Sequence, residues 1–190
     1  MTVLIFGKDG QVGRELQKVL QEEGNIIYLG RQDCDLSNID ALQDVLKQYQ
    51  PKIIINASAY TAVDRAQDEQ DLTFAINARA PEIMAKFITS QSNSLLIHYS
   101  TDYVFGGGKQ TPYQEDDETG PETQLGIYGQ TKLAGERAII DAFEASQLTS
   151  TYYILRTSWV YGDGGNFIKT MLRLAGDKDC LSVVADQVGA

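Results

Sequence analysis

Short runs of Ile, Leu and Val alternate with amphipathic segments along the chain, and this alternation is the strongest constraint on the fold. The expected strands cover residues 2–6, 25–29, 52–56, 94–100, 152–158 and 181–185. The expected helices cover residues 11–23, 38–49, 72–90, 129–145 and 165–175. Strands that are apolar throughout are typically covered on both faces. Strict strand–helix alternation predicts a parallel sheet with right-handed crossovers, so we expect an α/β protein with a doubly wound, six-stranded Rossmann fold.

The charge balance and the hydropathy pattern exclude several classes of protein. The 190 residues include 26 acidic and 16 basic side chains, for a net charge of -10. Nucleic-acid-binding proteins need a basic surface, so we expect no nucleic-acid partner. No apolar run reaches the roughly 18 residues of a membrane span, and the start "MTVLIFGKDG" lacks the basic head and the cleavage site of a signal peptide. Cys34 and Cys180 lack metal-site spacing. We therefore expect a cytoplasmic protein without membrane contacts.

Three glycines follow the first expected strand, in the segment "GKDGQVG". Gly7, Gly10 and Gly13 are spaced as GxxGxxG and open the first expected helix. Glycines at such positions allow a tight turn, a close approach of the backbone to a pyrophosphate, and close packing of helix on strand. The free N–H groups at the helix amino terminus attract the phosphates. The segment therefore predicts a dinucleotide site, the alternative being a turn that merely uses glycines.

The residues after the second expected strand bear on the choice of cofactor. An acidic residue there would bind the ribose hydroxyls of NAD, whereas this sequence has Gly30 and Arg31. An arginine suits a 2'-phosphate, so we expect NADPH, with NADH as the alternative; Arg31 as a solvated surface charge is the other interpretation. Asp35 would accept from the adenine amino group with Leu36 against the ring. Alternatively, both residues only shape the loop before a helix capped by Ser37.

Small residues end the third expected strand, in the segment "NASAYTAVD". Ala57 and Ala59 would let the backbone lie close to a flat ligand, and Tyr60 and Thr61 would line the edge of that ligand. A tight packing turn is the alternative interpretation. The segment is expected at the carboxyl edge of the sheet, which is the ligand side of such folds.

A tyrosine and a lysine lie four residues apart in "GIYGQTKLAGE", after a long acidic connection over residues 106–127. In a helix, Tyr128 and Lys132 fall on one line with Ile139 and Phe143, so Lys132 is expected to point inward. A buried ammonium needs a partner. We expect this ammonium, together with the positive charge of an oxidised nicotinamide, to favour the phenolate of Tyr128 and so to lower the pKa of the phenol. Tyr128 is then expected to protonate a carbonyl oxygen as hydride reaches the carbon.

The fourth expected strand ends in "HYSTDYVF", which supplies a third reactive group. The hydroxyl of Thr101 would hold the reacting oxygen or bond the phenol of Tyr128, with Ser100 as a competitor for that role. The alternative is that Thr101 and Asp102 only terminate the strand. We interpret His98, the sole histidine, as a packing residue, because this chemistry does not need it.

Together these motifs resemble the extended short-chain dehydrogenases/reductases. The segments "GKDGQVG", "NASAYTAVD", "IHYSTDYVF", "YGQTKLAGE", "RTSWVYG" and "NFIKTMLRLA" are more narrowly similar to the dTDP-4-dehydrorhamnose reductases. The resemblance implies reduction of the 4-keto group of a dTDP-sugar in the synthesis of dTDP-L-rhamnose, a precursor of surface polysaccharides. It implies Thr101, Tyr128 and Lys132 as the catalytic set, and Thr101, Asp102 and Trp159 against the substrate. Trp159 as core packing is the alternative interpretation.

The same resemblance implies a cofactor site, a metal candidate and an oligomer. The implied cofactor residues are Gly10, Gln11, Val12, Asp35, Leu36, Ala59, Tyr60, Thr61, Tyr99, Tyr128 and Lys132. Some family members bind Mg²⁺ at a dimer interface through glutamates, and Glu15 matches one of them, although an exposed helical glutamate is usually just solvated. A homodimer is the corresponding expectation.

Three departures from the family pattern qualify these expectations. The chain has "PETQLGIYG" where the family commonly has the shorter "PLNVYG", and Gly30 stands where the family has an aspartate. The sequence stops at "VADQVGA", where the family continues into a substrate domain, so we expect residues 1–190 to be the NAD(P)-binding Rossmann domain that carries the catalytic residues, active poorly by itself. The alternatives to a reductase are an NAD-dependent nucleotide-sugar epimerase or dehydratase, and a non-catalytic subunit resembling the methionine adenosyltransferase β subunit.

Overall fold

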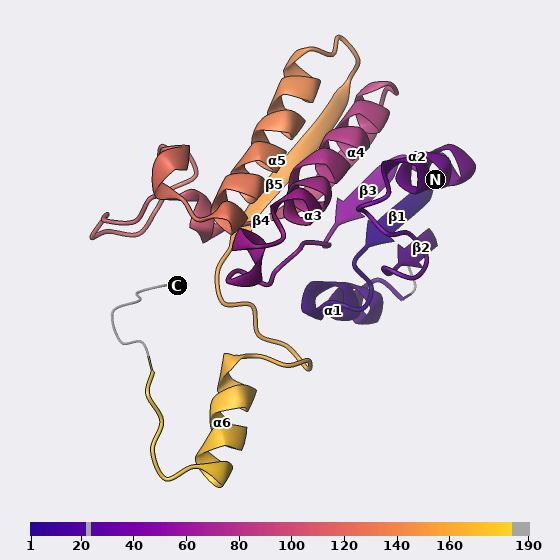
Figure 1. Cartoon of the computed structure of the whole chain (residues 1–190). Helices are drawn as coiled ribbons and strands as arrows, with labels where there is room; N and C mark the ends of the chain where they lie inside the picture. The colour runs from indigo at the N-terminus through magenta and orange to yellow at the C-terminus, as the bar shows by residue number, and fades with distance from the viewer. Residues whose placement is uncertain (22–23, 184–190) are drawn as a thin grey trace.

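The computed structural model describes residues 1–21 and 24–183 and contains one parallel sheet (Figure 1). Within these residues the sheet has five strands in the order β2-β1-β3-β4-β5, and every neighbouring pair is parallel. The strands are β1 (Thr2–Phe6), β2 (Asn25–Leu29), β3 (Ile53–Asn56), β4 (Ser94–Thr101) and β5 (Ser150–Thr157). The expected α/β fold is confirmed. The sixth strand, predicted at 181–185, does not form over 181–183, and its last two residues lie outside the described part.

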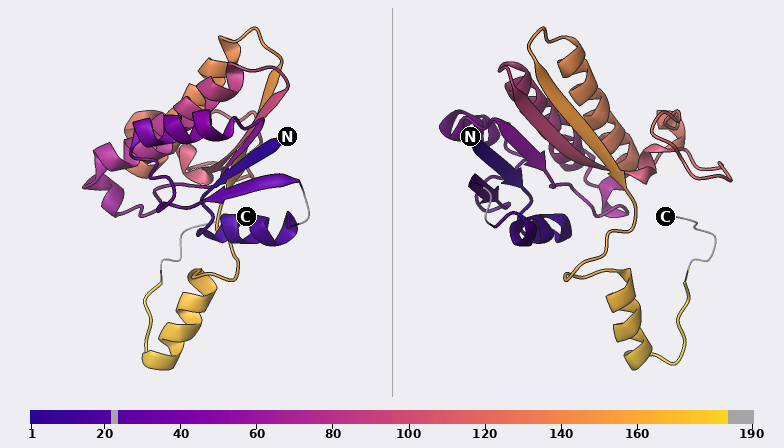
Figure 2. Two further views of the ribbon diagram at one scale, coloured as in Figure 1. Left: turned by 90° about the vertical axis from the view of Figure 1, so that its right-hand side faces the viewer. Right: turned by 180° about the vertical axis from the view of Figure 1, so that it is seen from behind.

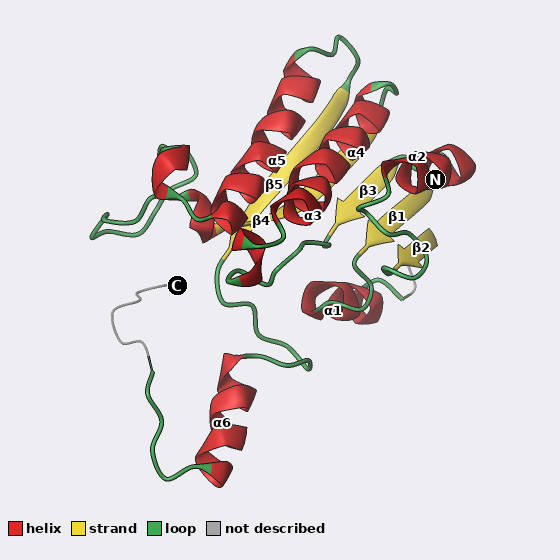
Figure 3. Cartoon of the chain, viewed as in Figure 1, coloured by secondary structure: helices red, strands yellow, loops and turns green. Residues whose placement is uncertain are grey.

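Helices connect the strands, as the alternation predicts (Figure 3). They are α1 (Gln11–Val19), α2 (Ile39–Tyr49), α3 (Gln70–Phe74), α4 (Ala80–Thr89), α5 (Ile127–Glu144) and α6 (Phe167–Asp177). The helix predicted over 72–90 is interrupted by the π-helical turn η2 (Ala75–Arg79) between α3 and α4. A π-helical turn of this kind frequently marks a functional site.

The cap of α2 differs from the prediction. Asn38, and not Ser37, is the N-cap, since the side chain of Asn38 accepts from the backbone N–H of Ala41 at 3.1 Å. Ser37 is already engaged: its hydroxyl donates to a carboxylate oxygen of Asp35 at 2.7 Å. Both residue types are good caps, and the local bond to Asp35 decides between them.

The sheet separates two unequal layers of helices (Figure 2). Helices α2, α4 and α5 pack on one face and on one another, while α1 lies on the other face. The core between the sheet and the thicker layer is apolar and closed; its largest buried members include Leu4, Phe6, Ile54, Leu96, Met84 and Ile139. Helix α6 stands apart from the sheet at the end of an extended connection, and none of its described residues is buried (Figure 1).

The long acidic connection before α5 is anchored at both ends. Two 3-10 turns, Asp102–Val104 and Glu122–Gln124, start and end it. Val104 and Leu125 pack with Leu133 of α5 in a small second core. This packing places the first turn of α5 beside the end of β4. Among the described helices, none is long and apolar enough to cross a membrane.

Candidate active site

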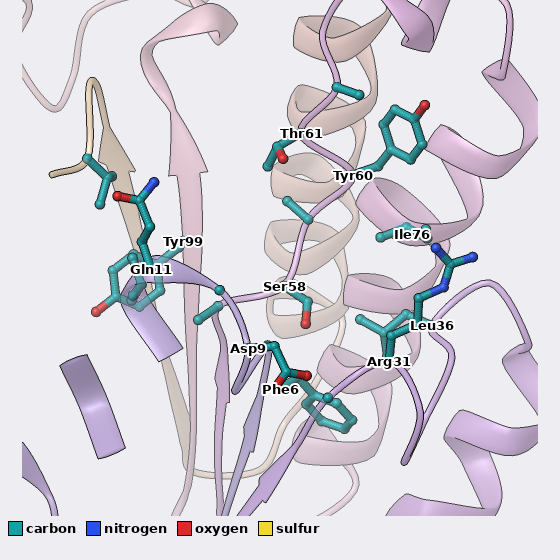
Figure 4. Close-up of a pocket in the computed structure, with 18 of the residues that line it drawn as sticks. Phe6, Asp9, Gln11, Arg31, Leu36, Ser58, Tyr60, Thr61, Ile76 and Tyr99 are labelled. Atoms are coloured by element: carbon teal, nitrogen blue, oxygen red, sulfur yellow. The ribbon is translucent and has the colours of Figure 1, made fainter. Parts of the chain in front are cut away.

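A cavity of about 880 Å³ opens at the carboxyl ends of the strands (Figure 4). Its volume lies in the upper part of the range of roughly 300–1,000 Å³ found for ligand and cofactor sites. Figure 4 shows Gln11 and Tyr99 at one end and Arg31 with Leu36 at the other. The structure brings together here nearly all the residues predicted to contact a cofactor: Gly7, Gly10, Gln11, Val12, Arg31, Asp35, Leu36, Ala57, Ala59, Tyr60, Thr61, Tyr99, Tyr128 and Lys132.

The glycine loop forms the floor of the cavity. Gly7 adopts φ +92°, and a Cβ atom there would lie 2.6 Å from the carbonyl oxygen of Ala57. Gly13 lies beneath the loop, where a Cβ atom would come within 2.0 Å of the carbonyl oxygen of Gly7. Gly10 is the N-cap of α1 and gives it no side-chain cap. The first N–H groups of α1 are therefore left for an anion at the cavity.

Two buried oxygens at the cavity are unpaired. Among the described residues, Gln11 Oε1 and Ser100 Oγ have no hydrogen-bond partner, although both belong to residues that line the cavity. Buried polar atoms without partners are rare in native proteins and indicate a missing ligand or water. The cavity thus has the glycine floor, the free helix terminus and the unsatisfied polar atoms that a dinucleotide would use.

Arg31 and Asp35 form an ion pair at the far end of the cavity, with 3.5 Å between Arg31 Nε and Asp35 Oδ2. Hydrogen bonds from the backbone and hydroxyl of Ser37 are the main reason why the pKa of Asp35 is lowered, so its carboxylate is ionised and able only to accept. A Cβ atom at Gly30 would lie 2.1 Å from Oδ2 of Asp9. Sequence reasoning missed Asp9, which places a carboxylate beside the position where the family has its aspartate.

The loop after β3 is fixed to the π-helical turn η2. Asn77, which is buried, accepts from the backbone N–H of Tyr60 at 2.8 Å and donates to its carbonyl at 3.1 Å. The same amide donates to Thr131 of α5 at 3.2 Å. The phenol of Tyr60 donates to Glu69 at 2.7 Å, and this bond raises the pKa of Tyr60. Sequence reasoning missed Asn77, which ties the cofactor loop to α5.

Thr101 and Tyr128 meet where β4 ends and α5 begins. The Thr101 hydroxyl accepts from the backbone N–H of Tyr103 at 3.2 Å and donates to Asp102 at 3.1 Å. The ring of Tyr103 packs edge-on against Tyr128, with 5.5 Å between centroids. Burial is the largest effect on Tyr128 and raises the pKa of its phenol, while a hydrogen bond with Thr101 lowers it. Tyr128 is therefore held protonated, as an acid must be.

Lys132 points inward as expected, with 1% of its surface exposed. Its Nζ donates to the carbonyl of Tyr99 at 2.7 Å and lies 3.2 Å from Nε2 of His98. Burial lowers the pKa of Lys132 to about 8, and Glu136 acts in the opposite direction. Glu136 is itself buried and bound by Arg156 at 2.7 Å. The lysine thus has its partners on β4.

The share of the expected lowering that rests on Lys132 is wrong for this structure. Within the described residues Lys132 makes no hydrogen bond to the phenol, and the pKa of Tyr128 is raised, not lowered. The reason is geometric, because the Lys132 amino group lies against the Tyr99 carbonyl and His98. Burial raises the pKa of the phenol by more than the hydrogen bond with Thr101 lowers it. His98, interpreted as a packing residue, is fully buried but also contacts the lysine.

A comparison with known protein families matches the family model described as the RmlD substrate binding domain over residues 1–190. The chain belongs to this family. It is 46% identical to the dTDP-4-dehydrorhamnose reductase of Salmonella typhimurium over 195 aligned residues, which cover 100% of this chain and 62% of the relative. The chain therefore spans about 62% of the length of this curated relative.

Solved structures of dTDP-4-dehydrorhamnose reductases superpose closely on this chain. A dTDP-4-dehydrorhamnose reductase from Clostridium acetobutylicum superposes with a TM-score of 0.88 at 40% identity, covering 100% of this chain and 64% of that one. The enzyme of the same name from Bacillus anthracis, solved in complex with NADP, gives 0.84 at 40% identity and covers 98% and 64%. MoeE5, solved with UDP-glucose and NAD, gives 0.75 at 25% identity and covers 92% and 60%.

The residues that the family pattern assigns to substrate or metal lie apart from the cavity lining. Trp159 is 45% exposed on the connection to α6, with φ +39°, and Asp102 is partly buried beside Thr101. Trp159 is therefore not part of the core formed by the described residues. Glu15 pairs with Lys18 at 2.9 Å. Over residues 1–21 and 24–183, no group of three or more His, Cys, Asp or Glu side chains could hold a metal ion, so magnesium gains no support.

Proposed function

We propose that this chain is the NAD(P)-binding, catalytic-residue-bearing domain of a dTDP-4-dehydrorhamnose reductase. The reaction is reduction of the 4-keto group of dTDP-4-dehydro-L-rhamnose to the hydroxyl of dTDP-L-rhamnose. One observation carries the proposal: a single cavity is lined both by the uncapped amino end of α1 and by Tyr128 and Lys132. The names of the relatives, and the NADP held by the Bacillus anthracis enzyme, support it.

The residues along the cavity would fix which end of the cofactor lies at which end of the cavity. The pyrophosphate would lie on the α1 terminus near Gly10, with the adenosine toward Arg31 and Leu36. The nicotinamide would then lie toward Tyr99 at the other end (Figure 4). Lys132, one turn after Tyr128, donates to the Tyr99 carbonyl there. When bound, the cofactor supplies the hydride. Because Arg31 offers a guanidinium beside the ribose position, we propose that NADPH is preferred over NADH as the hydride donor. The carboxylate of Asp9 would repel the 2'-phosphate and so reduce this preference.

Tyr128 would act as the proton donor in this proposal. Its phenol is kept protonated by burial, and its ring is held by the edge-on contact with Tyr103. As charge develops on the substrate oxygen, transfer of the phenolic proton neutralises it, and such transfer typically contributes about 10²–10⁴-fold in rate. Ser100, with its unpaired hydroxyl at the cavity, would be a second hydrogen-bond donor to that oxygen.

Asp102 and Trp159 would contact the dTDP-sugar. Asp102 lies directly after Thr101, and the exposed indole of Trp159 offers a flat apolar face of the kind that suits a deoxysugar. Asp102 is close enough to Tyr128 to act on the pKa of its phenol, and Trp159 lies between Thr157 and Val160, which both line the cavity. The remaining substrate contacts are proposed to come from the part of the family's length that this chain does not span.

The test is the stoichiometry of cofactor consumption by the protein expressed from its complete gene. With dTDP-4-dehydro-L-rhamnose we expect one NADPH oxidised per sugar reduced, and slower turnover with NADH. Conversion of the sugar without net cofactor consumption would instead indicate an epimerase or dehydratase. Cofactor binding with no conversion of any nucleotide sugar would reject the enzymatic proposal and favour a regulatory subunit.

A further inference from the structure

A chain of buried polar groups crosses from β3 to α5 behind the cavity. Asn56 and His98 are partners in the register of β3 and β4, and both have 0% of their surface exposed. Asn56 Nδ2 lies 3.1 Å from His98 Nδ1, and His98 Nε2 lies 3.2 Å from Lys132 Nζ. The imidazole therefore connects an amide on one side to the lysine head on the other.

The orientation of the Asn56 amide decides which imidazole nitrogen carries the proton. The backbone N–H of Ser58 donates to Asn56 Oδ1 at 3.1 Å, so the oxygen faces Ser58 and the NH₂ group faces His98. If the Asn56 amide were turned over, its NH₂ group would face the backbone N–H of Ser58, and two donors would oppose each other. With the NH₂ group as donor, His98 Nδ1 must be the acceptor. A neutral imidazole then carries its hydrogen on Nε2, toward Lys132.

An N–H from His98 restricts the state of Lys132. An ammonium has only donors, so it would face the Nε2–H donor to donor across 3.2 Å. A neutral amine satisfies both neighbours, because it donates to the Tyr99 carbonyl and accepts from Nε2–H. We infer that Asn56 and His98 are positioning residues that present an N–H to Lys132 and so make it a group that exchanges its proton and not a permanent cation.

The charges around this group are few. Glu136, one turn further along α5, is the anion that acts on Lys132, and its carboxylate is bound by Arg156 of β5. Tyr128 precedes Lys132 by one turn, and Asp102 faces Tyr128 from the 3-10 turn after β4. Burial lowers the pKa of His98 well below its ordinary 6.5, with Lys132 as a second cause, so the imidazole stays neutral. These neighbours agree with the hydrogen-bond pattern.

The tautomer can be measured directly because His98 is the sole histidine in the chain. In ¹⁵N-labelled protein without cofactor or substrate, two-bond ¹H–¹⁵N spectra give one set of imidazole signals. We expect a neutral Nε2–H tautomer that does not change between pH 5 and 9. An Nδ1–H tautomer, or an imidazolium forming near the ordinary pKa of 6.5, would overturn the inference.

Asn56→Asp tests the consequence for the lysine. The new carboxylate still accepts from Ser58 but would also accept from Nδ1–H, so that Nε2 offers a lone pair to Lys132. In ¹³C-lysine spectra we expect the pKa of Lys132 to rise from about 8. The rise should be at least about one pH unit, a tenfold gain in proton affinity. Because the new carboxylate also attracts the ammonium by its charge alone, the rise supports the inference only if the His98 spectra show the switch to Nδ1–H. A His98 that keeps Nε2–H in this folded variant, or a pKa of Lys132 that does not move, would overturn the inference.

If Asn56→Asp does not fold, His98→Asn provides the second arm. Asparagine can keep the contact with Asn56 but is too short to reach Lys132, so the pKa of the lysine should again rise; no rise would overturn the inference. Neither the His98 tautomer nor the Lys132 titration depends on enzymatic activity. An inactive protein with the expected tautomer and lysine titration would refute the proposed reductase while leaving the positioning role intact.

Discussion

Replacing Lys132 by methionine should stabilise the fold at neutral pH while destroying the proposed site. Burial holds the pKa of Lys132 at about 8, below its ordinary 10.5. At about 1.4 kcal/mol per pH unit, charging this buried amine costs the folded state about 3 kcal/mol at pH 7. Between the two pKa values the unfolded chain binds more protons than the folded one, so stability rises with pH there. At pH 10 the cost should fall below about 1 kcal/mol.

Urea unfolding of both proteins at pH 7, 8, 9 and 10 measures this cost. The pH-independent effect of Lys132→Met, which includes the lost bond to Tyr99, cancels in the comparison. We expect the stability of the variant relative to the wild type to fall by about 2–3 kcal/mol from pH 7 to pH 10. Lys47→Met, which removes an exposed lysine on α2, is the control and should give the wild-type curve. A difference between Lys132→Met and wild type that is the same at pH 7 and pH 10 would refute the reasoning.

Four further perturbations follow from the geometry. Gly13→Ala places a Cβ atom 2.0 Å from the Gly7 carbonyl oxygen, so it should lose NADPH binding by calorimetry; unchanged affinity would contradict the close packing of α1. Glu136→Gln breaks the buried pair with Arg156 and should cost about 2–3 kcal/mol in urea unfolding, less than a fully buried pair because Arg156 reaches water; no loss would show that the pair contributes nothing. Arg31→Ala should weaken NADPH by about tenfold while sparing NADH, and Asp9→Ala should strengthen NADPH; equal effects on both cofactors would reject the proposed 2'-phosphate contact.

The parts of the fold that follow from local chemistry were predictable from the sequence. Five of the six expected strands form, because their apolar runs have helices or neighbouring strands to cover them. The glycine positions were also informative: Gly7 and Gly13 leave no room for a Cβ atom. The inward direction of Lys132 follows from its helical line with Ile139, which is fully buried.

What the sequence could not provide depends on contacts between distant segments. The helix line puts Lys132 four residues after Tyr128, but the lysine amino group is held by β4, which precedes α5, at His98 and the Tyr99 carbonyl. Asn77 joins the cofactor loop to α5 across 17 residues on one side and 54 on the other, and no local pattern marks it. Asn56 and His98 did carry a signal in the sequence, because they are polar residues inside strands that the alternation predicts to be buried.

The central claim is that Tyr128 gives its proton to the ketone while the cofactor is bound in the same cavity. Tyr128→Phe, assayed with NADPH and dTDP-4-dehydro-L-rhamnose beside a calorimetric titration of NADPH, tests it most directly. The expected result is a loss of at least about 100-fold in kcat, with the Kd for NADPH unchanged. A variant that keeps its rate, or one whose loss of rate is matched by loss of NADPH binding, would contradict the claim.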